Sequence, residues 1–242
     1  MLYLNKRLIA FTTLVACLVS SQVRADLFDL NWELRREADG IQVYTASVPD
    51  SKFKAVQAQT TMQTTVNQLV ALVQDAAACA EWADLCKQAQ LLETTSDTEM
   101  YVYTLNDLPW PVTDREAVAH VAWAYQPDTE TVTMRATVTD AMDAPDDMKK
   151  KKNTVRLTYG VTQWTFIPAA DGKVEVISHA HVDPGGATPA WLTNRLLTDS
   201  PVKTLQRMRD IVTTDRYKGD EFAFMQAADS EPANTQTATP VE

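Results

Sequence analysis

The feature that most constrains the fold is a long stretch, residues 89–182, in which one extended segment follows another with only short turns between them. Clusters of proline, aspartate and glycine separate the segments. The predicted strands are Ala89–Thr94, Glu99–Leu105, Ala117–Tyr125, Val132–Thr139, Val155–Ile167 and Val174–Val182. Because parallel strands need long crossover connections, these short connections predict an antiparallel sheet.

The segments before this stretch add two strands and two helices to the expected order. Leu30–Glu37 is predicted to form a short helix that ends at Asp39-Gly40, because glycine is common just past a helix C-terminus. Ile41–Val48 and Phe53–Met62 alternate like strands. Apolar residues in Thr65–Ala80 recur with the spacing of a helix.

The last periodic segment is predicted to be a long helix. Its apolar residues at helical spacing are Trp191, Leu192, Leu196, Val202, Leu205, Met208, Ile211 and Val212. Pro201 would cost about 3 kcal/mol inside an unbroken helix, so we expect a kink there, or a restart with Ser200 as the cap. The sequence therefore predicts an α+β fold in which a curved antiparallel sheet covers a C-terminal helix. If the inward residues are too small to fill the space between them, a ligand cavity remains.

Residues 1–25 resemble a secretory signal peptide. A basic start is followed by an apolar run and by small residues before Ala25, which predicts cleavage before Asp26. The alternative is a lipobox at residues 14–17, in which Cys17 would carry a lipid anchor. Either reading takes the protein out of the cytoplasm, and we expect a periplasmic or secreted location.

The charge balance narrows the classes of partner. The net charge is −10, and removal of residues 1–25 would make it −13 because three basic residues and no acid are lost. An acidic protein of this kind does not suit nucleic acid, whose phosphates require a basic surface. We expect one domain, residues 26–217, that works as a monomer, and a disordered acidic tail, residues 218–242.

Cys79 and Cys86 are the two cysteines that remain after cleavage at Ala25. In an oxidising compartment they are expected to form a disulfide, with a pair of buried thiols as the alternative. A straight helix would hold residues seven positions apart about 10 Å from each other, so the bridge requires a turn between them.

A few polar residues could carry chemistry. His179, His181 and Asp183 alternate along a predicted strand and so share one face. This pattern has three interpretations: a metal site, a polar contact to a ligand head group, or a solvated strand face. We expect no metal and no cofactor. The basic run Lys149–Lys152 is expected to be a solvated turn, with a contact to lipid head groups as the alternative.

Several segments in a fixed order resemble START domains, the steroidogenic-acute-regulatory-related lipid-transfer family, and in particular its exported bacterial members. They are DGIQVY, EWADLCKQAQLLE, LPWPVTDRE, VRLTYGVTQWTFIP and HVDPGGATPAWLTNRLL. The resemblance covers about residues 28–215. It implies a helix-grip fold with an apolar tunnel that holds one lipid between the sheet and the last helix.

The resemblance also implies a gate. An omega loop between two strands corresponds to Leu108–Thr113, where Trp110 and Pro111 would form an apolar lip. A facing loop before the last helix contains Gly185 and Gly186, which would act as a hinge. A proline-stiffened hairpin loop is the simpler reading of the first segment. Next to it, Asp114, Arg115 and Glu116 are expected to anchor the following strand by charge pairing.

Sterol-carrying members of the family place an acid and a base at positions that correspond to Val102 and Val121. Both positions are apolar here, which predicts less polar recognition in the tunnel. The full set of residues expected at the cavity or its gate is Val102, Trp110, Pro111, Val121, Trp123, His181, Gly185, Gly186, Trp191, Leu192, Leu196 and Leu205.

These observations favour a carrier that is not an enzyme, that binds a lipid or another apolar small molecule and that touches a membrane transiently. The alternative is a cyclase-like or hydrolase-like enzyme acting in the same cavity, with His179, His181 and Asp183 as the candidate acid and base. A third reading is a protein-interaction module.

Overall fold

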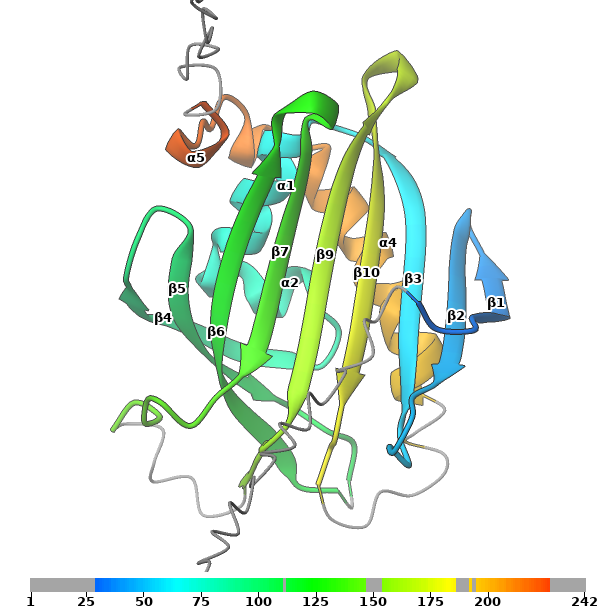
Figure 1. Ribbon diagram of the computed structural model, residues 1–242, viewed down its shortest axis with the longest axis vertical. Coiled ribbons are helices and arrows are strands. Elements are labelled where there is room, and N and C mark those ends of the chain that lie inside the picture. Colours follow the sequence, from blue (N-terminus) through cyan, green and yellow to red (C-terminus); the bar gives the residue numbers. More distant parts are fainter. Residues whose placement is uncertain (1–28, 111, 147–153, 186–191, 193–194, 227–242) are drawn as a thin grey trace, which may run out of the picture.

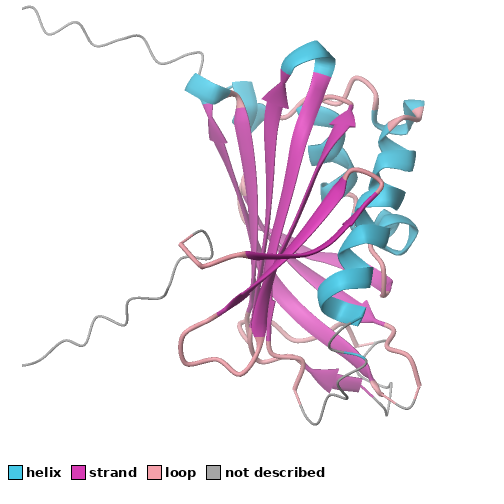
Figure 2. Ribbon diagram, turned by 90° about the vertical axis from the view of Figure 1, so that its right-hand side faces the viewer, coloured by secondary structure: helices cyan, strands magenta, loops and turns pink. Residues whose placement is uncertain are grey.

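The computed structural model describes residues 29–110, 112–146, 154–185, 192 and 195–226. One large curved antiparallel sheet forms the body of the molecule, and the helices cover one of its faces (Figure 1, Figure 2). The strands are β1 Glu33–Ala38, β2 Ile41–Ser47, β3 Lys54–Gln63, β4 Cys86–Thr94, β5 Glu99–Asn106, β6 Asp114–Gln126, β7 Thr131–Val138, β8 Thr154–Arg156, β9 Gly160–Ala169 and β10 Lys173–Val182. The helices are α1 Val66–Gln74, α2 Cys79–Trp82, α4 Ser200–Val212 and α5 Ala223–Gln226.

The strand order along the sheet is β1-β2-β3-β10-β9-β7-β6-β5-β4. Each neighbouring pair in this order is antiparallel, as the short connections predicted. The predicted strand Val155–Ile167 is in fact two strands, because β8 leaves the ladder and pairs in parallel with the start of β6.

The first predicted helix, Leu30–Glu37, is wrong. This segment contains β1, an edge strand that pairs with β2. Asp39 and Gly40 both have positive φ angles, 53° and 71°, and form the tight turn of a hairpin rather than the end of a helix. Two consecutive positive φ angles are typical of the hairpin turns that Asp-Gly favours.

The first long helix is shorter than its apolar spacing suggested. Thr65 caps α1 through a capping box with Gln68, and the helix then breaks at Asp75. The Asp75 side chain accepts a hydrogen bond from the backbone N–H of Ala78, which starts a short 3₁₀ turn that leads into α2. The break lets the chain turn back toward the sheet before β4.

The C-terminal helix grips the sheet through one apolar face. Val202, Leu205, Met208 and Val212 of α4 are buried, and Leu205 and Met208 are completely inaccessible to solvent. Burial of each such side chain stabilises the fold by about 2 kcal/mol. A π-helical turn, Arg195–Asp199, precedes α4, and Pro201 lies in the first turn of α4. The predicted restart with Ser200 as the cap is wrong: Asp199 keeps helical angles, φ −87° and ψ −43°, and the hydrogen-bond pattern changes from π to α at Ser200 without a break in the helix.

Residues 218–226, expected in the disordered tail, pack on the domain. The side chains of Phe222, Phe224 and Met225 contact the main core, and the Phe224 ring lies 6.1 Å from that of Trp123. The remainder of the predicted tail, the predicted signal peptide with Cys17, and the run Lys149–Lys152 lie outside the described residues. Among the described helices, none is long and apolar enough to cross a bilayer.

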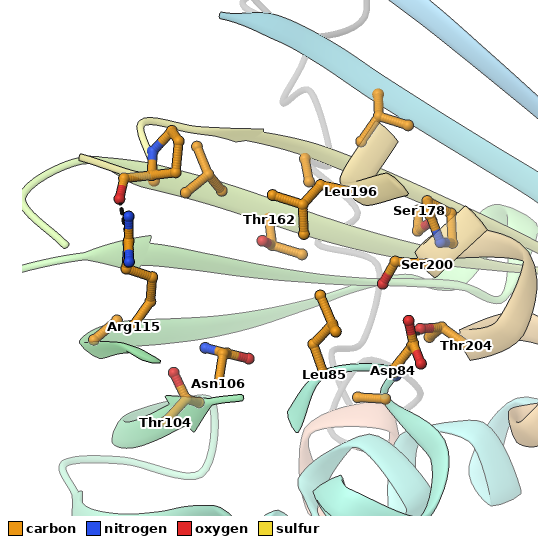
Figure 3. A pocket seen from close by; sticks show the side chains of 18 of the residues that line it. Asp84, Leu85, Thr104, Asn106, Arg115, Thr162, Ser178, Leu196, Ser200 and Thr204 are labelled. Carbon is orange, nitrogen blue, oxygen red and sulfur yellow. Dashed lines mark hydrogen bonds between the residues drawn. The ribbon is translucent and has the colours of Figure 1, made fainter. Parts of the chain in front are cut away.

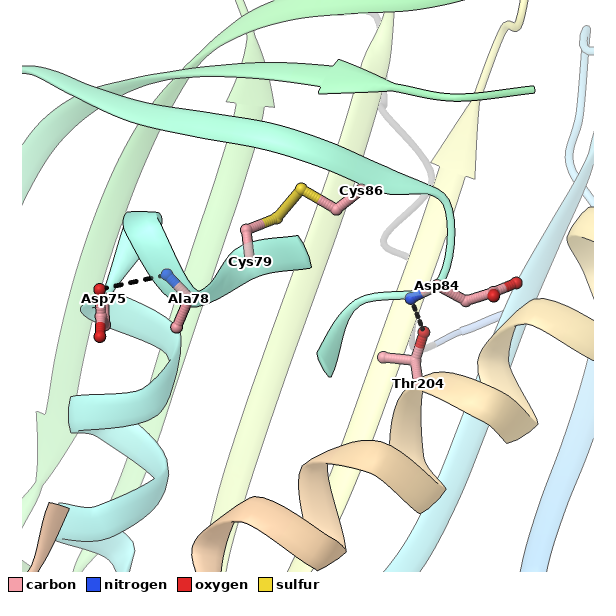
Figure 4. The surroundings of a disulfide bond; sticks show 6 residues. All are labelled: Asp75, Ala78, Cys79, Asp84, Cys86 and Thr204. Atoms are coloured by element: carbon pink, nitrogen blue, oxygen red, sulfur yellow. Dashed lines mark hydrogen bonds between the residues drawn. A yellow bond between two sulfur atoms is a disulfide. The ribbon is translucent and has the colours of Figure 1, made fainter. Parts of the chain in front are cut away.

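The predicted disulfide between Cys79 and Cys86 is present (Figure 4). It joins the start of α2 to the start of β4, and the chain turns between them at Ala83–Cys86, where the N–H of Cys86 donates to the carbonyl of Ala83. Leu85 has a φ angle of 70° in this turn, a conformation that leucine rarely adopts. The bridge and the turn together fix the position of residues 83–85.

Replacement of both cysteines, Cys79→Ser with Cys86→Ser, should lower the free energy of unfolding by about 2.5 kcal/mol, the chain-entropy value for a loop of this length. For a domain of this size the midpoint of thermal unfolding should fall by about 5–10 °C. Chemical denaturation of the variant and of the oxidised wild type measures the difference. Equal stabilities would show that the surrounding packing alone holds the loop.

Candidate functional site

A cavity of about 480 Å³ lies between the sheet and the start of the C-terminal helix (Figure 3). Its walls come from the inner faces of β3, β5, β6, β7, β9 and β10, from the loop after α2, and from residues 196–204. Most of the lining is apolar, and its aliphatic and aromatic members include Val56, Trp82, Leu85, Leu108, Leu157, Trp164, Val182, Leu196 and Leu197.

The cavity exists because the inward residues at this end of the sheet are small. One row across three neighbouring strands consists of Ala136, Thr162 and Ala180. Four residues further along the same strands, on the same face, the row is Val132, Phe166 and Val176, and these side chains are fully buried in the main core. The sheet is therefore tightly packed at one end, where these side chains share the main core with residues of α1 and α4, and it leaves space at the other end.

Arg115 closes one end of the cavity and joins two loops. Its side chain is buried, and its Nε donates to the carbonyl of Pro184 at 2.6 Å while its Nη2 donates to the carbonyl of Gly185 at 3.1 Å. Its Nη1 donates to the carbonyl of Thr113 at 2.5 Å. Burial lowers the pKa of Arg115 from its usual value. The guanidinium thus ties the loop that precedes β6 to the loop that follows β10.

The charge pairing expected next to the omega loop occurs at two of the three residues. Asp114 pairs with Lys87 at 3.3 Å, and Glu116 accepts a hydrogen bond from the Tyr103 hydroxyl at 2.9 Å and lies 3.7 Å from Arg156. Among the described residues no carboxylate pairs with Arg115, whose hydrogen bonds go to backbone carbonyls and the Thr113 hydroxyl. The sequence alone cannot tell an arginine that donates to backbone carbonyls from one that pairs with a carboxylate, so the ion pair predicted for Arg115 was wrong.

The predicted gate residues can be placed in part. The Trp110 side chain is 90% exposed, two residues after the cavity-lining Leu108. Gly185 has a φ angle of 67°, a conformation that few residues other than glycine adopt. Pro111, Gly186 and Trp191 lie outside the described residues.

Among the predicted cavity residues, Leu196 lines the cavity. Val102 and Val121 share faces with the lining residues Thr104 and Ala119, which lie two positions nearer to the cavity. The structure places Val102, Val121, Trp123 and Leu205 in or against the main core, and Leu192 is fully buried.

His179 and His181 lie on the side of the sheet that faces away from the helices. The ring of His181 is hydrogen-bonded to the Ser51 hydroxyl at 3.0 Å and to the Tyr159 hydroxyl at 3.2 Å. His179 is one of the residues that line the cavity. Its ring, however, is hydrogen-bonded to the Gln57 side chain and lies 5.6 Å from the ring of Trp32. The two histidines and Asp183 are therefore not brought together inside the cavity. The described residues contain no cluster of potential metal ligands.

The sequence interpretation missed the loop between α2 and β4. Asp84 and Leu85 line the cavity from this loop, and the backbone N–H of Asp84 donates to the Thr204 hydroxyl on α4 at 3.0 Å (Figure 4). The small residues Ala117, Ala119 and Ala136 were also missed. Alanines at alternate positions of the predicted strands could have indicated that the sheet leaves space at these three residues.

The fold and the cavity define a helix-grip domain. The model of the START domain family matches residues 17–216, and the chain belongs to this family. The family predicted from the sequence motifs is therefore confirmed. Membership supports lipid binding or transfer at the level of the family.

The chain is also similar to individual proteins. The protein PA1579 of Pseudomonas aeruginosa is 32% identical over 180 residues, which cover 74% of this chain and 85% of that protein. The crystal structure of a STAR-related lipid transfer protein from Xanthomonas axonopodis is 29% identical, with a TM-score of 0.66, and the match covers 76% of this chain and 99% of that one. Human StAR-related lipid transfer protein 5 shares the fold with a TM-score of 0.67 at 16% identity, over 75% of this chain and 86% of that one.

Replacement of Arg115 by methionine should destabilise the protein by about 3 kcal/mol, because three carbonyl oxygens lose their donors in a poorly hydrated site. Lysine should restore little, since one ammonium cannot reproduce a planar guanidinium that donates in several directions. Arg36→Met is the matched control: Arg36 pairs with Asp199 at the surface, and its loss should cost less than about 1 kcal/mol. Equal losses of stability in the two methionine variants, measured by urea denaturation, would contradict the role of Arg115.

His181 should make the stability depend on pH. Burial lowers the pKa of His181 below its usual value, against the opposing effects of the Phe53 backbone and of Asp183. The unfolded chain then binds a proton at a higher pH than the folded chain, so stability should fall as the pH decreases from about 6.5, by at most about 1.4 kcal/mol per pH unit. Denaturation of wild type and His181→Gln between pH 7.5 and 5 checks this, and an equal slope in both would show that another group is responsible.

Proposed function

We propose that the protein binds one lipid or a similar apolar molecule in the cavity between the sheet and α4, and carries it without chemical change. The observation that carries this proposal is the apolar cavity of about 480 Å³ next to a well-packed core. Its size falls in the range of small-molecule sites. Burial of the ligand's apolar surface, at about 25 cal/mol per Å², is the driving force.

Loading requires that the ligand pass between water or membrane and the cavity. Trp110 is almost fully exposed on the loop that leads from the cavity-lining Leu108 into β6. Tryptophan favours the interface between a membrane and water. We therefore include transient membrane contact through this loop in the proposal, with the protein otherwise acting as a monomer.

An oxidising compartment fits the disulfide between Cys79 and Cys86, because such bridges are rare in the cytoplasm. Together with the signal-like residues 1–25, this supports export to the periplasm or beyond. Lipid anchoring through Cys17 is the alternative form of the same proposal.

A bulky residue at Ala119 should block binding, because Ala119 lines the cavity from the inner face of β6. Ala119→Phe should reduce the uptake of a fatty acid or phospholipid at least tenfold, as measured by native mass spectrometry of the loaded protein. The matched control is Ala124→Phe, the same change on the exposed face of the same strand, which should bind like wild type. Wild-type uptake by a folded Ala119→Phe variant would contradict the proposal that this cavity holds the ligand.

A further inference from the structure

One end of the cavity carries a cluster of three polar side chains. Thr104 and Asn106 alternate on β5 and therefore share its inner face, and Asn106 lies opposite Arg115 of β6 in the register of the two strands. All three residues line the cavity, and Figure 3 shows them at one end of it, away from Ser200 and Thr204 at the other end. We call Thr104, Asn106 and Arg115 the polar cluster.

The Asn106 side chain is available to a ligand. Its amide makes no hydrogen bond within the described residues, and it is not one of the partnerless polar groups that are sealed from solvent in the protein interior. The same is true of the Thr104 hydroxyl. Both groups can donate hydrogen bonds. Because a polar group in a mostly apolar enclosure is costly to leave without a partner, a ligand that pairs with them gains affinity.

The charges in the cavity wall favour an anion. Among the described lining residues that can carry a positive charge are Arg115 and Lys54, and no described carboxylate pairs with either of them. The acidic residue of the described lining is Asp84, whose Oδ1 lies 3.4 Å from Nη2 of Arg207, a residue outside this wall. The wall is therefore more positive than the protein as a whole, whose net charge is −10.

The charge of Arg115 is fixed in place but not neutralised. Its hydrogen bonds go to the carbonyls of Thr113, Pro184 and Gly185 and to the Thr113 hydroxyl, all of which are uncharged. These bonds leave one N–H of Nη2 without a partner among the described residues. A cation that is already held rigidly loses little conformational entropy when a ligand binds beside it, and its field is strong in a poorly hydrated cavity.

We propose that Asn106 is a specificity-determining residue: its amide, together with the Thr104 hydroxyl, donates to the carboxylate of a long-chain acid, beside the fixed charge of Arg115. The two carboxylate oxygens can accept from both donors. An ammonium head group has no acceptor and would meet the like charge of Arg115. This inference rests on the proposed function of the cavity and narrows its ligand to an apolar chain with an anionic head group.

The experiment is a competition between three ligands of equal chain length, dodecanoic acid, dodecanol and dodecylamine, present at equal concentrations at pH 7.5. Native mass spectrometry measures how much of each the protein takes up. The wild type should bind the acid at least about tenfold better than the amine. Asn106→Leu removes the amide at similar volume and should lower the ratio of bound acid to bound alcohol about tenfold, as expected for a hydrogen bond to a charged group.

Two further variants separate the head-group contact from indirect effects. Asn106→Asp places a negative charge opposite Arg115 and should shift the preference from the acid toward the amine. Ser200→Ala is the matched control, because it removes a polar group from the other end of the cavity, and it should keep the wild-type ratios. Wild-type ratios in a folded Asn106→Leu variant would overturn the proposal, as would a wild type that prefers the amine. Because each ratio is compared between variants, differences in how the ligands ionise in the spectrometer cancel.

A measurement on the wild type keeps the test valid even if the Asn106 variants do not fold. With dodecanoic acid labelled with ¹³C at the carboxyl carbon, nuclear magnetic resonance follows the pKa of the bound acid. This pKa should lie below its value in water, because a neighbouring cation and hydrogen-bond donors favour the ionised form. A raised pKa would place the head group against the apolar wall and overturn the proposal. If the wild type binds all three ligands equally, only this inference fails; if it binds none, the proposed function fails as well.

Discussion

The structure depends on an uneven distribution of side-chain volume along the inner face of one sheet. At one end, Val132, Phe166 and Val176 lie in the same buried core as Leu205 and Met208 of α4 and the apolar face of α1, and this core holds the helices on the sheet. At the other end, Ala136 and Ala180 occupy equivalent inward positions and leave the cavity. Because protein interiors are close-packed elsewhere, the large residues hold the fold together while the small ones keep the space open.

The loops around the cavity are held by directed polar contacts. Arg115 connects the loop before β6 with the loop after β10 through backbone carbonyls, and Asp84 connects the loop after α2 with α4. These polar contacts lie outside the apolar core that contains Leu205 and Met208 of α4.

Much of the fold could be predicted from the sequence because its strands and helices have clear periods. The hairpins between residues 89 and 182 followed from local signals. The helix predicted at Leu30–Glu37 failed because Asp39-Gly40 suits a helix end and a hairpin turn equally well, and only pairing with β2 decides between them. The position of the cavity along the sheet was not predicted: Val102 and Val121 were expected at the ligand but lie in or against the main core, and the lining residues are Thr104 and Ala119, two positions along the same faces. The place of Asp84 in the cavity wall could not be predicted from the sequence, because it depends on the disulfide loop and on the hydrogen bond to Thr204.

The central claim is that the cavity holds an apolar ligand, and native mass spectrometry of the protein purified from cells tests it most directly. We expect a discrete adduct of roughly the mass that such a cavity can enclose, and the same molecule should reappear as a lipid after extraction into organic solvent. A protein that is recovered without a ligand, and that takes up no fatty acid, phospholipid or sterol when challenged, would contradict it.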